Sequence, residues 1–143
     1  MKKLTLAVLL SFWSVASLAA GYEHIPNKFF SLIEKGEVNG AIDYLYDTNK
    51  WVSKKSDQVI NLKNQLSQLT PLVGNYIYHE LVSETKVGTR YAHLIYIVGY
   101  ERQPLRYEIK VYKVKNGWRF QGVSFDASIT DDIEKQANQR LTK

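Results

Sequence analysis

The hydrophobic period of this chain changes near Gly74, and that change limits the fold more than any other feature of the sequence. Before Gly74, apolar residues recur every three or four positions. After it, they alternate with polar residues. A period near 3.6 is typical of a helix and a period of two is typical of a strand. The pattern therefore predicts an α+β domain in which helices come first and a sheet follows.

The helical half divides at its glycines and its proline. Residues 27–46 predict a helix, a turn near Gly36 and a second helix. A further helix is expected to begin after Ser56-Asp57 and to end at Pro71 and Gly74. All of these helices carry one apolar stripe, which is typical of packing against a core.

The sheet half contains turn signals at residues 86–89, at 102–104 and at Asn116-Gly117. Two-residue loops there predict a four-stranded antiparallel meander over residues 75–126 with one continuous apolar face. Leu94, Ile109 and Phe120 share that face. The same register predicts two rows of neighbours across it, His79 with Tyr96, Ile109 and Ser124, and Ile77 with Val98, Tyr107 and Asp126.

The opposite face of this sheet is also partly apolar, with Tyr78, Ile95 and Ile97 among its charged residues. Apolar area of this kind predicts that another part of the protein, or a second molecule, covers this face. One candidate is a second copy of the chain, which would make a homodimer. The other is the tail, residues 127–143, where Ile133, Ala137 and Leu141 have a helical spacing.

The first twenty residues have the pattern of a signal peptide, with Lys2 and Lys3, an apolar run and small residues at Ala19 and Ala20. The run is too short for a stable membrane anchor. Cleavage after Ala19 or Ala20 would release a periplasmic or secreted protein with a single domain over residues 21–126. Loss of the two lysines would lower the formal charge from +5 to +3, a mild excess. The chain has no cysteine, so packing alone must stabilise it.

A helical hairpin, a third helix and a meander that ends in NGWRFQGVSF resemble the nuclear transport factor 2-like, or cystatin-like cone, superfamily, particularly its small secreted bacterial members. The resemblance implies a curved sheet wrapped around helices, with a conical cavity inside. Superfamily enzymes such as ketosteroid isomerases use Asp, His or Tyr in that cavity, while many relatives are not catalytic. No catalytic set of a family matches this chain, and shared shape alone does not imply an activity.

The predicted register places five polar side chains in or at the mouth of the cone, which are the candidate ligand-binding residues His79, Tyr96, Tyr107, Ser124 and Asp126. Burial shifts the pKa values of such groups, so they could orient a ligand or move a proton. Alternatively, each polar group bonds to a neighbour while its ring packs in the core.

Other kinds of site are not supported. The string HELVS departs from the zinc-protease motif at Ser83 and lies in a predicted strand, so no metal site is expected. No cofactor motif and no nucleophile elbow occur. Basic residues gather around the last turn with Tyr112, but a solvated strand face explains them, and export makes nucleic acid an improbable partner.

The expected function is therefore non-catalytic binding of a small, largely apolar ligand or of a protein partner through the cone pocket or the sheet face. The alternative is a cofactor-free lyase or isomerase, with His79 or Asp126 as the base and Tyr96 or Tyr107 as a hydrogen-bond donor. A third reading is an interaction protein whose cone is filled with side chains.

Overall fold

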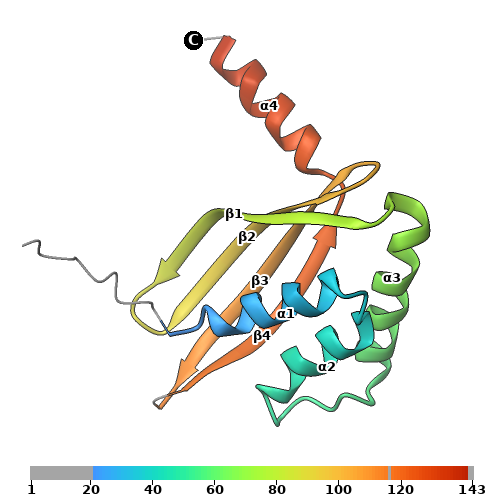
Figure 1. The fold of residues 1–143 in the computed structure, drawn as a ribbon. Helices are drawn as coiled ribbons and strands as arrows, with labels where there is room; N and C mark the ends of the chain where they lie inside the picture. Colours follow the sequence, from blue (N-terminus) through green and yellow to red (C-terminus); the bar gives the residue numbers. More distant parts are fainter. Residues whose placement is uncertain (1–20, 116, 142–143) are drawn as a thin grey trace, which may run out of the picture.

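The computed structural model describes residues 21–115 and 117–141, and the predicted signal peptide lies outside them. Figure 1 shows helices packed against one face of an open sheet, which confirms the predicted α+β class. The elements in chain order are α1 (His24–Glu34), α2 (Val38–Asp47), α3 (Asp57–Val73), β1 (Tyr76–Val87), β2 (Tyr91–Tyr100), β3 (Pro104–Val114), β4 (Gly117–Asp126) and α4 (Ile129–Leu141).

The turn between α1 and α2 forms at Gly36, as predicted. Gly36 has a φ of 74°, which a residue with a side chain rarely adopts. Its N–H donates to the Ile33 carbonyl, and the Glu37 N–H donates to the Leu32 carbonyl, both at 2.9 Å. This Schellman pair satisfies the last carbonyls of α1 and reverses the chain. The two helices therefore lie together on the concave face of the sheet (Figure 1).

The four strands form one antiparallel meander in the order β1-β2-β3-β4. Leu94, Ile109 and Phe120 are all at most 1 % exposed, so they share the buried face as predicted. Phe29 and Phe30 of α1 pack onto this face and are fully buried. Each such side chain stabilises the fold by roughly 1.5–3 kcal/mol. The curved sheet is thus held around the first two helices.

The strand pairing differs from the predicted rows. His79 pairs with Val98, and Tyr96 pairs with Tyr107 rather than with Ile109. The three-residue loop after β1 moves the partners beside it by three positions, and the bulge between Leu81 and Ser83 reduces this shift to two at His79. The longer loop after β2 moves the partners of β2 and β3 by two positions. A shift of two keeps every side chain on its face. The predicted faces are therefore correct for His79 and Leu81 and for β2 and β3, although the rows were wrong, whereas residues 83–87 of β1 exchange faces.

In β4 the predicted face is wrong beyond Phe120. A β-bulge there pairs Val111 with Phe120 but Lys110 with Gly122, so one extra residue enters β4. The following side chains exchange faces. Val123 and Phe125 pack on the core, while Ser124 and Asp126 lie on the outer face. The turn before β4 also differs, because Val114 pairs with Gly117 and Lys115 takes a φ of 53°.

Two further bulges occur in β1, between Tyr76 and Tyr78 and between Leu81 and Ser83. The first leaves Ile77 59 % exposed, although the predicted register placed it in the core. Bulges of this kind are common on edge strands, where they hinder pairing with other chains.

The two edges of the sheet differ in whether another segment hydrogen-bonds to them. At the β4 edge, the Phe120 N–H donates to Thr48 Oγ1 at 2.9 Å and the Phe120 carbonyl accepts from Asn49 Nδ2 at 3.1 Å. The end of α2 therefore closes this edge. No backbone hydrogen bond from another described element pairs the β1 edge between Ile77 and Val87.

The C-terminal tail is helical, as the spacing suggested, but α4 does not cover the sheet. It projects beyond the sheet in Figure 1, and none of its described residues is buried.

Candidate functional site

The centre of the cone is filled by side chains. Tyr107 is fully buried, and its ring lies 5.9 Å from the ring of Phe30. Its hydroxyl lies 2.7 Å from the hydroxyl of Tyr100. Burial, followed by the neighbouring Tyr100, raises the Tyr107 pKa, so this phenol stays protonated. Tyr107 is therefore a satisfied core residue rather than the wall of an open pocket.

His79 is held between two aromatic residues. Its ring stacks on Phe30 with centroids 4.3 Å apart, and its Nδ1 lies 2.6 Å from the Tyr76 hydroxyl. Burial lowers the pKa of His79, and the carboxylate of Glu34 offsets part of that effect. The imidazole is therefore mostly neutral at pH 7.

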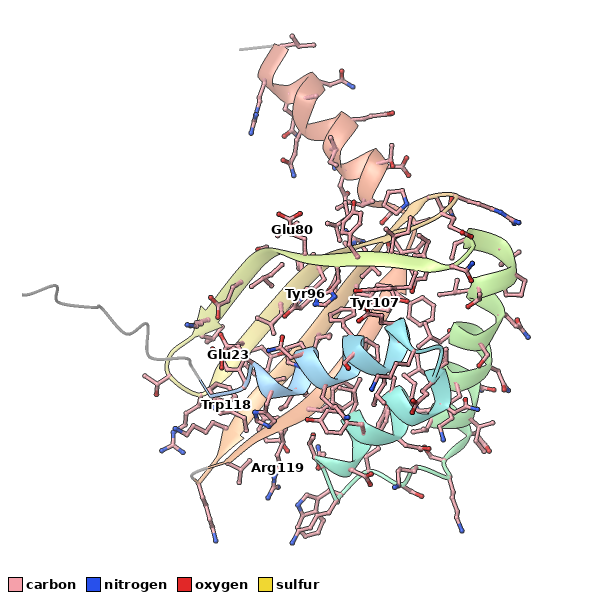
Figure 2. All side chains as sticks on the ribbon, in the orientation of Figure 1. Glu23, Glu80, Tyr96, Tyr107, Trp118 and Arg119 are labelled. Carbon is pink, nitrogen blue, oxygen red and sulfur yellow. The ribbon has the colours of Figure 1, made fainter. Side chains whose placement is uncertain are left out.

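A groove remains where the start of α1 faces β1 and β2. We call it the N-terminal groove, and it encloses about 480 Å³. Its lining combines apolar side chains with acceptors, namely Tyr22, Glu23, Pro26, Asn27, His79, Glu80, Leu81, Glu84, Leu94 and Tyr96. Figure 2 shows Glu23 at the start of α1, Tyr96 between α1 and the sheet, and Glu80 projecting away from the helices. Of the five residues predicted from sequence, this groove brings together His79 and Tyr96.

Tyr96 forms the inner wall of the groove and is 7 % exposed. Burial, together with the negative charges of Glu84 and Glu23, raises the pKa of Tyr96 to about 12. Its hydroxyl is therefore protonated at every physiological pH. The Tyr96 and His79 rings lie 6.0 Å apart between centroids, so both can contact one small molecule.

The groove also holds groups that the sequence analysis missed. The bulge after Leu81 turns Glu84 toward the core face, where it pairs with Leu94, and Lys86 Nζ lies 3.3 Å from its carboxylate. Tyr22 is 2 % exposed, and its buried hydroxyl has no hydrogen-bond partner among the described residues. Glu23 and Asn27 stand four residues apart, on one side of the start of α1, which is the one sequence signal that could have placed them together.

A second hollow of about 370 Å³ opens between the α1–α2 turn, α3 and the start of β1. Its lining includes Glu34, Leu66, Leu69, Tyr76 and Tyr100. Tyr76 lines this hollow and its hydroxyl contacts His79 of the N-terminal groove. The Tyr76–His79 pair therefore separates the hollow from the N-terminal groove. The N-terminal groove is the stronger candidate, because it gathers more ionisable groups around an apolar wall.

Asp126 and Ser124 do not belong to this groove. Asp126 accepts from Arg106 Nη2 at 2.9 Å and from the Ser128 N–H at 2.8 Å, and Arg106 also binds Asp132 of α4. Burial raises the pKa of Asp126, but the bonds from Ser128 and Arg106 outweigh it and lower the pKa. Asp126 therefore anchors the start of α4 on the outer face, and it cannot act with His79 on one substrate. Ser124 pairs with Glu108 on that face and is exposed.

The outer face carries the other charged groups of the sheet. His93 Nε2 lies 2.9 Å from Glu108. Arg106, one of the basic residues predicted to gather around the last turn, lies at the opposite end of β3 from that turn and is engaged by carboxylates. Within the described residues, no group of three or more His, Cys, Asp or Glu side chains could hold a metal ion. None of the helices described has the length and apolar character needed to cross a bilayer.

No protein-family model matches this chain, and searches of curated proteins and of solved structures found no similar protein.

Proposed function

We propose that this is an exported, non-catalytic binding protein that holds a small, largely apolar ligand in the N-terminal groove. One observation carries the proposal: the cone is filled by Phe29, Phe30 and Tyr107, while the groove beside it remains open over about 480 Å³. Sites for small molecules are mostly apolar hollows with a few polar groups that orient the ligand.

The lining suggests the chemistry of the ligand. Leu81, Leu94 and the Tyr96 ring offer an apolar wall. The polar groups at the rim are chiefly acceptors: the carboxylate of Glu84, with Lys86 beside it, and the carboxylate of Glu23, which already accepts from the Gly21 N–H. A ligand with an apolar body and a donor-rich or cationic head fits both parts.

The signal-peptide pattern supports the periplasm or the exterior as the location, and the arrangement of helices and meander supports kinship with the cone superfamily. We propose both the exported location and the kinship with the cone superfamily.

The test compares two neighbouring residues of β1. Leu81 lines the groove and is 46 % exposed, whereas Val82 is 51 % exposed and lies outside the lining. Octylamine and octanoate serve as probes in an NMR titration of the protein. We expect octylamine to shift the amide signals of Glu84 and Tyr96 more strongly than octanoate does. Leu81→Ser should weaken octylamine binding about fivefold, because roughly 1 kcal/mol of apolar contact is lost.

The matched variant Val82→Ser should leave octylamine binding unchanged. Equal weakening by both variants, or equal binding of both probes without shifts at the groove, would contradict the proposal.

A protein partner is a second candidate, supported by the exposed apolar side chains Ile77, Tyr78 and Val82 along β1 and by the uncovered outer face. Exposed apolar area of this kind often marks an interaction surface. A second copy of this chain is the partner that we propose there.

A further inference from the structure

Gly21 directly precedes Tyr22 and Glu23, which line the N-terminal groove. The Gly21 N–H donates to Glu23 Oε2 at 2.7 Å, and the Gly21 carbonyl lies 3.0 Å from His24 Nδ1. The first residues therefore fold back on the start of α1. The carboxylate of Glu23 lies directly against the backbone nitrogen of Gly21.

The next residue fixes this segment to the sheet. Tyr22 is 2 % exposed, and its ring contacts Trp118 edge-on with centroids 4.7 Å apart. Lys86 Nζ of β1 lies 5.9 Å from the centre of the same ring. The Tyr22 carbonyl accepts from the Ile25 N–H at 2.9 Å. The core thus begins at Tyr22, one residue after Gly21, so the position of the Gly21 nitrogen is set by packing.

The sequence left two cleavage positions open, after Ala19 and after Ala20. We propose that the protein is cleaved after Ala20 and that Glu23 is the binding site for the new N-terminal ammonium of Gly21. Hydrolysis of the Ala20–Gly21 peptide bond by a signal peptidase consumes one water. It leaves a carboxylate on Ala20 and an amine on Gly21, which takes up a proton in neutral solution. The inference rests on the export in the proposed function.

The geometry fits a charged pair. A distance of 2.7 Å falls in the range of hydrogen bonds between an ammonium and a carboxylate, which are stronger than those between neutral groups. Cleavage after Ala19 would move the charge to Ala20, about 3.8 Å further along the chain, and would leave Gly21 an ordinary amide donor. Cleavage after Ala20 therefore places the new charge where an acceptor already lies. It also fixes that charge at the rim of the N-terminal groove, since Glu23 lines it.

The test is a thermodynamic cycle on the mature domain, residues 21–143. Three N-termini are compared: free Gly21, Nα-acetylated Gly21, and a chain extended by Ala20. Acetylation keeps the N–H donor and removes the charge, whereas the extension keeps the charge and displaces it. With Glu23 present, we expect both changes to lower Tm by on the order of 2 °C, the effect of one exposed ion pair in a domain of this size.

In Glu23→Gln the same two changes should leave Tm unaltered, because the acceptor charge is gone. Glu134→Gln, an exposed acid on α4, is the matched control and should keep the full effect. An effect of acetylation that is the same in Glu23 and Glu23→Gln would overturn the ammonium site.

The mass of the protein recovered from the periplasm tests the cleavage position. A chain that begins at Gly21 supports the inference, and one that begins at Ala20 overturns it. A protein that keeps residues 1–20 in the cytoplasm would instead contradict export, whereas the Tm cycle would still report on the site itself. The two failures are therefore distinguishable.

Discussion

At the scale of single residues, His79 is a polar side chain whose contacts are those of a structural residue. Its ring stacks on Phe30 and its Nδ1 meets the Tyr76 hydroxyl, so the fold favours the neutral imidazole. Burial accordingly lowers its pKa below the ordinary value of 6.5, with Glu34 opposing the shift. The unfolded chain then binds more protons than the folded one below about pH 6.5.

The stability that neutral His79 contributes is therefore fully present above pH 6.5 and is lost as the pH falls through the lowered pKa. We expect the free energy of unfolding in urea to decrease between pH 7.5 and pH 5.5, and part of that decrease to vanish in His79→Phe and His79→Gln. If both variants keep the full decrease, His79 does not carry it.

At the scale of elements, the contact of the end of α2 with β4 includes one buried amide beside the Thr48 hydroxyl. Asn49 is 7 % exposed, and it donates to the Phe120 carbonyl while its Oδ1 accepts from the Trp51 N–H at 3.3 Å. Asn49→Ala would leave a strand carbonyl unpaired at the edge of the core. We expect a loss of about 1–3 kcal/mol in the free energy of unfolding.

Urea unfolding measures this loss, with Asn61→Ala on the exposed side of α3 as the control. A change below about 0.5 kcal/mol for Asn49→Ala would show that water replaces the amide.

The strands also show what the sequence could predict. The class, the order of elements and the shared face of Leu94, Ile109 and Phe120 followed from periodicity, because burial of one face selects alternate residues. The error in β4 arose because a bulge adds one residue without an obvious marker in sequence. Val123 and Phe125 are larger and more apolar than Gly122 and Ser124, and that contrast was the available sign of the exchange.

The candidate site was less predictable than the fold for the same reason. His79 and Tyr96 fell on the correct face, since two-residue errors preserve it, whereas Ser124 and Asp126 fell beyond the bulge. Glu84 entered the groove only because a second bulge turned it inward.

At the scale of the whole molecule, the outer sheet face remains uncovered. Ile95 and Ile97 of β2 lie there half-buried, between the charged pairs of β3 and the exposed apolar residues of β1. The tail helix could have covered this face, but α4 projects beyond the sheet and is tied to it by its first turn, through Arg106 and Asp132 (Figure 1). A second copy of the chain can bury both outer faces against each other in a two-fold interface.

We therefore expect the mature protein to sediment as a dimer at high micromolar concentration. Ile95→Glu should shift it to the monomer, because a charge in the middle of an apolar interface is left unpaired. Trp51→Glu is the control, since Trp51 is 78 % exposed on the connection between α2 and α3. A wild-type protein that sediments as a monomer at that concentration would remove the dimer and leave the outer face to another partner. If Trp51→Glu gave the monomer and Ile95→Glu did not, the interface would lie at the helices, on the opposite side of the sheet from Ile95.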